Sequence, residues 1–123
     1  MLNPNSDTKI YLACAVTDMR KGINGLSILA SQTISQNNNN KNTMKAGAMF
    51  VFKGKRSDRI KILWWDGQGF CLFYKCLDRG KFTWPKSTND GHNIRVTKAQ
   101  LSMLIEGIDW RNPTWSNPPE YLA

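Results

Sequence analysis

The middle of the chain alternates between apolar runs and short polar separators, a pattern typical of strands joined by turns. Three runs are rich in the aromatic and β-branched residues that favour strands: Ala48 to Lys53, Arg59 to Trp65 and Phe70 to Leu77. The last two are separated by a segment that contains Asp66-Gly67, a strong signal for a tight hairpin. A turn at 78–81 then leads to a short strand predicted at Phe82 to Trp84, which Pro85 ends. Consecutive strands joined by short turns predict an antiparallel meander.

Helical spacing of apolar residues occurs on both sides of this region. A strand predicted at Lys9 to Cys14 precedes a helix predicted at Asp18 to Gln32, with Thr17 and Asp18 as candidate N-caps. A second helix is predicted at Lys98 to Glu106, where Thr97 and Gln100 have the spacing of a capping box.

Together these elements predict a single α+β domain over 1–123. Its antiparallel meander sheet of about four to five strands is expected to pack against two helices. The Asn-rich segment 36–45 is expected to form a flexible loop, and the segment 109–123, which contains prolines, an extended C-terminal tail. Alternation directs Ile60, Ile62 and Trp64 into the core. The third strand is apolar on both faces, so its second face is either covered by the tail or exposes an aromatic patch to a partner.

Positive charge is concentrated in the turns of the predicted meander. The chain has 17 Lys and Arg against 9 Asp and Glu, a formal net charge of +8. The first and third turns of a meander share one end of the sheet, opposite the turn that carries Asp66. We call this shared end the basic rim; its residues are Lys53, Lys55, Arg56, Arg59, Arg79 and Lys81. Clustered cations attract polyanions, which indicates a phosphate-binding edge, although a solubilising surface explains the charge equally well.

The sequence offers little catalytic or metal-binding chemistry. Cys14, Cys71 and Cys76 form no CxxC pair and His92 is the only histidine, so a zinc site lacks ligands. We expect the cysteines to be buried free thiols of a reducing cytoplasm. Most aspartates fall in expected turns or at a helix start, where backbone capping explains them. The prediction is a non-enzymatic protein without cofactor or metal.

The expected location follows from the absence of an export signal and of a long apolar run in the sequence. We expect a cytoplasmic protein with no membrane partner, associated with the nucleoid if it binds DNA.

Three stretches of unusual composition follow one another in the chain. They are Thr17-Asp18-Met19-Arg20-Lys21-Gly22 with Gly25-Leu26; Phe50-Val51-Phe52 through Arg59-Ile60-Lys61-Ile62-Leu63-Trp64-Trp65-Asp66-Gly67 to Leu72-Phe73-Tyr74-Lys75, Gly80 and Trp84-Pro85; and Gln100-Leu101 with Glu106-Gly107-Ile108-Asp109-Trp110. In this order they resemble the TnpB accessory protein, the product of the second open reading frame in the sixty-six family of insertion sequences. The Asn-rich loop departs from the usual pattern of that family.

The resemblance implies a role in DNA transposition, as an accessory to a separate transposase that carries the catalytic carboxylates. The implied partners are DNA, at the transposon ends or the target, and that transposase. Functional candidates carried over from the motifs are Asp18, Arg20, Lys21, Arg59, Lys61, Lys75 and Arg79. The aromatic residues of the motifs are either functional or part of the core: Trp64, Trp65, Tyr74 and Trp84.

Two hypotheses of function therefore stand side by side. In the first, the protein binds DNA through Arg20, Lys21, Lys53, Lys55, Arg56, Arg59, Lys61, Lys75, Arg79 and Lys81. In the second, it is an interaction module that docks on the transposase through Trp65, Phe73 and Trp115 without contacting DNA. Arg20 and Lys21 illustrate the ambiguity, because they can bind phosphate or pair with Asp18 or Glu106.

Overall fold

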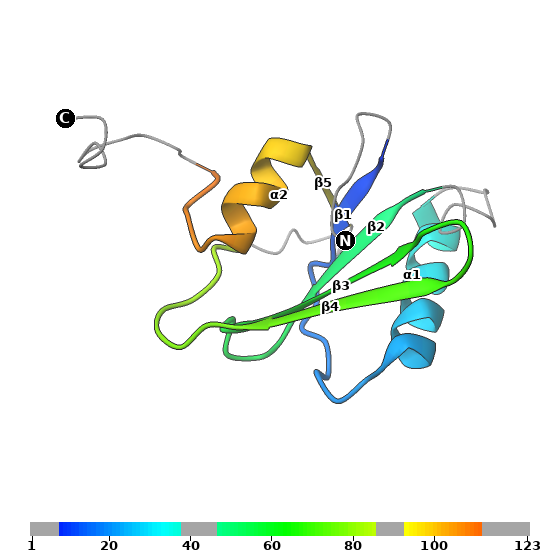
Figure 1. Cartoon of the computed structure of the whole chain (residues 1–123), viewed down its shortest axis with the longest axis horizontal. Helices are drawn as coiled ribbons and strands as arrows, with labels where there is room; N and C mark the ends of the chain where they lie inside the picture. Colours follow the sequence, from blue (N-terminus) through cyan, green and yellow to red (C-terminus); the bar gives the residue numbers. More distant parts are fainter. Residues whose placement is uncertain (1–7, 38–46, 86–92, 112–123) are drawn as a thin grey trace.

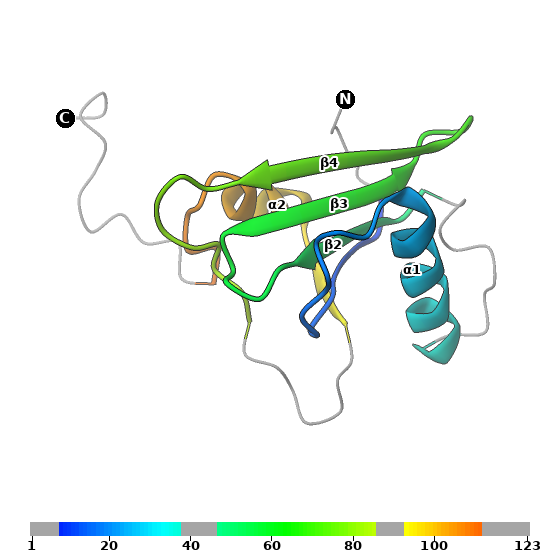
Figure 2. The ribbon, with the colours of Figure 1, turned by 90° about the horizontal axis from the view of Figure 1, so that it is seen from below.

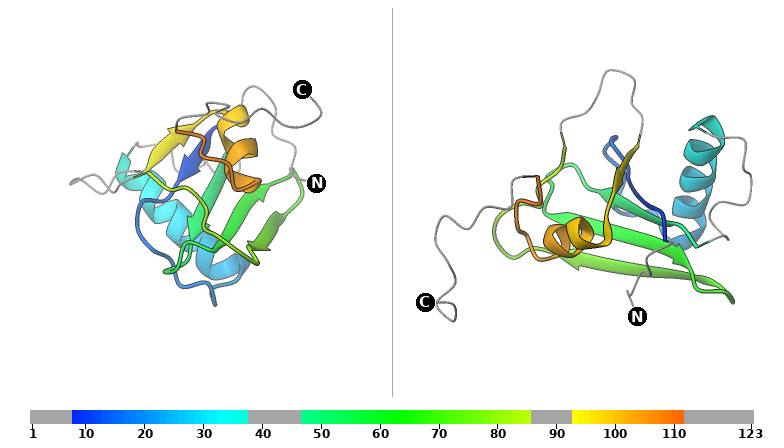
Figure 3. Two further views of the ribbon diagram at one scale, coloured as in Figure 1. Left: turned by 90° about the vertical axis from the view of Figure 1, so that its left-hand side faces the viewer. Right: turned by 90° about the horizontal axis from the view of Figure 1, so that it is seen from above.

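The body of the molecule is a five-stranded sheet with one helix on each face. The computed structural model describes residues 8–37, 47–85 and 93–111 (Figure 1). In chain order the elements are β1 (Ile10–Leu12), α1 (Ile23–Asn37), β2 (Met49–Lys53), β3 (Arg59–Trp65), β4 (Phe70–Cys76), β5 (Ile94–Val96) and α2 (Lys98–Ile105). Figure 3 shows the sheet between the two helices. The predicted class, a single α+β domain with two helices, is confirmed.

The sheet is mixed, with strand order β4-β3-β2-β1-β5. β2, β3 and β4 form the predicted antiparallel meander, in which Ile62 lies between Val51 and Phe73. β1 pairs with β2 in parallel, an arrangement that needs the long crossover supplied by α1. β5 pairs with the other side of β1 in antiparallel orientation. The sequence predicted only antiparallel pairs, so the β1–β2 pair corrects that expectation.

One predicted strand and both predicted bounds of the first helix are wrong. The segment Phe82 to Trp84 is not a strand, although Phe82 and Trp84 are both buried in the core. The first helix begins at Ile23 rather than Asp18, because the preceding segment continues along β2 and the Thr17 N–H donates to the Lys53 carbonyl over 2.9 Å. The helix ends at Asn37, so the start of the predicted Asn-rich loop is helical and 38–45 lie outside the described residues.

Each face of the sheet has its own hydrophobic core. The α2 face joins Ile60 and Ile62 to Leu101 and Leu104, as alternation in β3 predicts. The α1 face is built by Phe50, Phe52 and Leu63 from the sheet with Leu26 and Ala30 from the helix. Isolated helices of 15 and 8 residues are marginal in water, so burial against the sheet stabilises both. Helices on both faces correct the expectation that the second face is covered by the tail or exposed to a partner.

Side-chain hydrogen bonds fix the ends of several segments. The capping box of α2 is present as predicted: Gln100 N–H donates to Thr97 Oγ1 and Thr97 N–H donates to Gln100 Oε1. Trp84 Nε1 donates to the Ala13 carbonyl over 2.9 Å, and Trp110 Nε1 donates to the Thr83 carbonyl over 2.8 Å. Trp110, in the segment predicted as a tail, is therefore part of the core, and 112–123 lie outside the described residues.

Candidate nucleic-acid interface

The two basic turns of the meander meet at one end of the sheet. The turn after β2 and the turn after β4 are joined by two backbone hydrogen bonds of 2.7 Å each, from the Leu77 N–H to the Asp58 carbonyl and from the Phe82 N–H to the Ser57 carbonyl. Figures 1 and 2 show both turns at the same end and the β3–β4 turn at the other. The predicted convergence of these turns is confirmed, and it follows from the hairpin connections alone.

Exposed cations surround the junction of the two turns. Lys55, Arg56 and Lys81 are exposed and line one open hollow together with Asp58 and Gly80. Arg79 is exposed in the same turn as Lys81. Among the described residues, ion pairs join Arg20 to Asp18 and Arg111 to Asp109, and neither pair involves the rim. The junction therefore presents several cations whose charge is available to an anionic ligand.

The local backbone explains how the first turn places its cations. The Ser57 N–H donates to the Gly54 carbonyl and the Gly54 N–H donates to the Arg59 carbonyl, which closes a tight loop around Lys55 and Arg56. Ser57 has φ 60°, a left-handed conformation that costs a non-glycine residue roughly 1–2 kcal/mol. The loop is held in this strained form because the Ser57 carbonyl accepts from the second turn.

A third segment, 13–21, packs beside the first turn. The Thr17 N–H donates to the Lys53 carbonyl, and a Cβ on Gly54 would lie 2.8 Å from Met19 Cγ, so the glycine allows close approach. A second open hollow lies between the segments, lined by 16–19 on one side and by Lys55, Arg56 and Arg59 on the other. The rim thus extends from the two turns toward Asp18 and Arg20.

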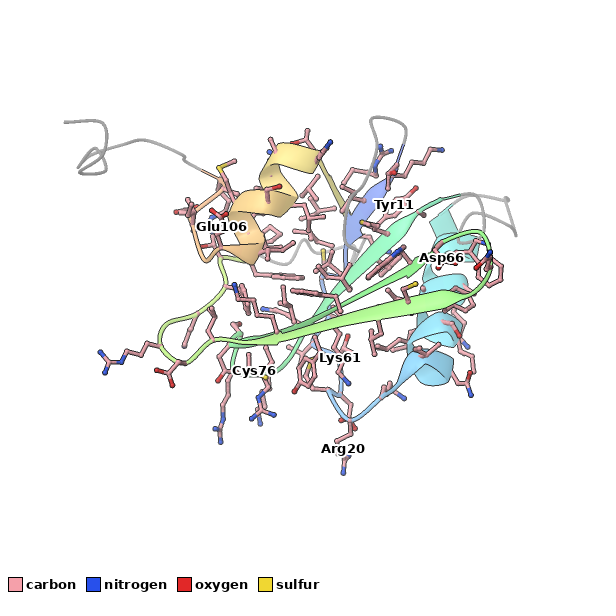
Figure 4. The ribbon with its side chains drawn as sticks, in the orientation of Figure 1. Tyr11, Arg20, Lys61, Asp66, Cys76 and Glu106 are labelled. Carbon is pink, nitrogen blue, oxygen red and sulfur yellow. The ribbon has the colours of Figure 1, made fainter. Side chains whose placement is uncertain are left out.

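Arg20 and Asp18 form a bidentate pair at the edge of this hollow. Arg20 Nη2 lies 2.8 Å and Nε 3.0 Å from the Asp18 carboxylate, whose Oδ1 also accepts the Arg20 backbone N–H. These hydrogen bonds hold the pKa of Asp18 well below its usual range. Arg20 reaches into solvent on the side of the molecule away from Glu106 (Figure 4). The sequence left open whether Arg20 binds phosphate or pairs with Asp18 or Glu106, and in the structure it pairs with Asp18.

Two of the predicted nucleic-acid-binding lysines hold the fold instead of facing solvent. Lys61 is only 7% exposed, and its Nζ donates to the Lys21 carbonyl over 2.9 Å. Lys75 is half-buried on the other face, where its Nζ donates to the Ile105 carbonyl at the C-terminus of α2 over 2.7 Å. A cation at that position also interacts favourably with the helix dipole. Both ammonium groups therefore have intramolecular roles, and we leave them out of the exposed interface.

The remaining predicted cations take intermediate positions. Lys53 is half-buried, with Nζ 3.5 Å from Ser57 Oγ and 5.8 Å from the centre of a Trp84 ring. Lys21 is exposed just before α1, and Arg59 is exposed with Nη1 3.4 Å from the Tyr74 hydroxyl. Both Arg59, in the basic rim, and Lys21 are thus accessible to a ligand.

The structure does not gather the residues predicted to bind a protein partner. Trp65 packs edge-on against Phe70, with ring centres 5.1 Å apart, on the face of the sheet that α1 covers. Phe73 lies opposite Ile62 and packs on the other face, beside the core that α2 covers. Trp115 lies outside the described residues. Trp65 and Phe73 thus belong to opposite surfaces, which sequence alternation along each strand could have revealed.

Asp66 and Cys71 interact with each other beside the β3–β4 turn. Asp66 Oδ1 accepts the Gln68 and Gly69 N–H groups in the β3–β4 turn, and these bonds lower its pKa. The cysteines differ from expectation, because only Cys14 is buried, whereas Cys71 is half-buried and Cys76 exposed. Burial raises the pKa of Cys71, which donates to Asp66 Oδ2.

The described ranges 8–37, 47–85 and 93–111 hold neither a metal-type cluster nor a membrane-spanning helix. No three Cys, His, Asp or Glu side chains in these ranges lie together as a metal site would need. No helix in the same ranges combines the length and the apolar content required to cross a membrane.

Sequence comparison relates the chain to known proteins. A family model described as "IS66 Orf2 like protein" matches residues 8–115. "Uncharacterized protein y4hO" of Sinorhizobium fredii (strain NBRC 101917 / NGR234) is 40% identical over 117 residues, which cover 94% of this chain and 95% of the relative. "Uncharacterized protein y4jC" of the same organism is 34% identical over 110 residues, which cover 89% of this chain and 87% of the relative. No solved structure matches.

Proposed function

Because the chain belongs to the IS66 Orf2-like family of transposition-associated proteins, we propose that it acts in transposition as a non-catalytic accessory protein that binds DNA. The DNA is that of the transposon ends or the target, and the second partner is the catalytic transposase of the same element. The binding surface consists of the exposed cations of the basic rim: Lys55, Arg56, Arg59, Arg79 and Lys81.

The observation that carries this proposal is the junction of the two basic turns. Hydrogen bonds from Leu77 and Phe82 hold the turns together, so the backbone positions that carry the cations have a fixed spacing before any ligand arrives. A preorganised cluster of cations binds a phosphate backbone with less loss of entropy than flexible side chains on separate loops. Arginine can also contact phosphate oxygens with two parallel N–H donors.

Two observations support an accessory role over catalysis. The Asp18 carboxylate is occupied by Arg20, and the Asp66 carboxylate accepts amides of its own turn. Both aspartates therefore have structural partners that a metal-binding carboxylate would have to give up.

The surface geometry favours DNA binding over docking on the transposase through Trp65 and Phe73. The rim gathers its cations at one end of the sheet, whereas Trp65 and Phe73 lie on opposite faces. A protein-binding hot spot needs its anchors clustered near the centre of one interface.

A matched pair of triple variants tests the proposal. The rim variant Lys55→Gln/Arg56→Gln/Lys81→Gln removes three charges at the junction. The control Lys9→Gln/Arg95→Gln/Lys98→Gln removes three exposed charges, from the residue before β1, from β5 and from the start of α2, away from the junction. Fluorescence anisotropy at low salt should show DNA affinity falling at least ten-fold in the rim variant and much less in the control. Equal losses in the two variants, or no DNA binding by the wild type, would refute the proposed interface.

A further inference from the structure

One aromatic side chain of the central motif stands apart from the others because it is exposed. Tyr74, in β4, is 46% exposed, whereas Trp84 is 8% exposed and Trp64 packs against the α2 core. β4 is an edge strand, so its side chains are covered by neighbours on one side only. The core therefore does not account for the ring of Tyr74.

A buried lysine makes a cation–π contact with the Tyr74 ring. Lys61 Nζ lies 4.6 Å from the ring centre and is fixed by its bond to the Lys21 carbonyl. Lys61 is buried and is the cross-strand partner of Tyr74, so it lies on the inner side of the edge strand. One face of the ring is thus held in place by a cation–π contact, while nearly half of Tyr74 remains exposed.

The ring also adjoins the basic rim. Arg59 Nη1 lies 3.4 Å from the Tyr74 hydroxyl, and Arg59 lines the same hollow as Lys55 and Arg56. Figure 4 shows Lys61 and Cys76, which lies two positions after Tyr74, in the lower half of the view above Arg20 and far from Asp66. An immobilised aromatic face therefore lies next to cations that are free to contact phosphates.

We propose that Tyr74 is a stacking platform for an unpaired base, so that the ligand of this surface is DNA with a single-stranded segment. This inference rests on the proposed function, because the rim must hold the backbone that carries the base. Stacking on aromatic side chains accepts any base, since every base has a π face. Bases inside a duplex are already stacked on their neighbours and cannot cover the ring without leaving the helix. The platform therefore favours single strands, frayed ends or junctions over intact duplex.

The test uses a single-stranded oligonucleotide that contains 2-aminopurine and a duplex of the same sequence. Stacking on an aromatic ring quenches the fluorescence of 2-aminopurine, so quenching and anisotropy report stacking and binding separately. Tyr74→Leu removes the ring, and Tyr74→Phe keeps it without the hydroxyl. Tyr11→Leu is the matched control. The Tyr11 ring also lies near an arginine, with its centre 5.4 Å from Arg95 Cζ, but it is away from the rim (Figure 4). Thermal melting identifies any variant that fails to fold.

The expected result separates the two ligands. Tyr74→Leu should weaken binding of the single strand roughly ten-fold or more and abolish quenching, with duplex affinity unchanged. Tyr74→Phe and Tyr11→Leu should behave as the wild type.

Failure of this inference can be told from failure of the proposed function. If Tyr74→Leu, shown by melting to be folded, binds and quenches the single strand as the wild type does while the rim variant loses both DNAs, the platform is refuted and the rim stands. If Tyr74→Leu loses the single strand while the rim variant keeps full affinity for both DNAs, the rim is refuted together with the claim that it holds the strand, and only the contact between Tyr74 and a base stands. Absence of binding to either DNA by the wild type refutes both.

Discussion

Replacing Trp84 by phenylalanine tests how the segment after β4 is held against the sheet. The indole Nε1 donates to the Ala13 carbonyl over 2.9 Å, and both residues are only 8% exposed. Phenylalanine leaves that carbonyl buried without a donor, which costs about 1–3 kcal/mol. The smaller ring also leaves a cavity, which adds about 1 kcal/mol. The free energy of unfolding should therefore fall by about 2–4 kcal/mol.

Trp110→Phe is the matched comparison. Trp110 is equally buried, but its Nε1 donates to the carbonyl of Thr83, a half-buried residue that water can reach. We expect a cost about 1 kcal/mol smaller than that of Trp84→Phe, because water replaces the lost donor. Urea denaturation followed by circular dichroism measures both values. A Trp84→Phe cost equal to or below that of Trp110→Phe would show that the Ala13 hydrogen bond does not anchor this segment.

Three further predictions concern individual contacts. Lys75→Met should lower the free energy of unfolding by about 1–2 kcal/mol in urea denaturation, because it removes the charged donor to Ile105 at the end of α2. DNA affinity should stay unchanged, and a loss of affinity of about the same free energy would mean that Lys75 belongs to the interface. Thr97→Ala should cost about 1 kcal/mol in the same measurement, and no loss would mean that the capping box is not formed in solution. Asp18 has a lowered pKa in the folded state, so its stabilising contribution is present above the unfolded pKa of about 3.9 and is lost as the pH falls. Asp18→Asn should therefore make the free energy of unfolding depend less on pH between about pH 2 and 5. Equal pH dependence in the variant and the wild type would contradict the pairing of Asp18 with Arg20.

Much of the candidate site was predictable because local signals determine a meander. The Asp66-Gly67 hairpin and the short turn at 54–58 force β2, β3 and β4 to run up and down, and this alone brings 54–58 and 78–81 to one end. The capping box of α2 was equally local. Predictions of this kind depend on residues that are neighbours in the sequence.

Long-range features could not be predicted from the sequence because they depend on which distant segments pack together. The parallel pairing of β1 with β2 leaves no trace in either strand, since each of them is short and apolar in any case. The burial of Lys61 depends on the backbone of Lys21, 40 residues away, and that of Lys75 on the end of α2. Alternation places both lysines on a face but does not show what covers it. Phe82 to Trp84 has the composition of a strand, yet this segment does not pair with β4, because both rings pack in the core instead.

The salt dependence of DNA binding tests the basic rim most directly. The logarithm of the affinity of the wild type for duplex DNA should fall linearly with the logarithm of salt concentration, by about 0.9 for each phosphate contacted. In Lys55→Gln/Arg56→Gln/Lys81→Gln this slope should become shallower by about 0.9 for every contact that the three side chains make, whereas the control Lys9→Gln/Arg95→Gln/Lys98→Gln should keep the slope of the wild type. Parallel lines for the wild type and the rim variant would show that DNA, if bound at all, is held elsewhere.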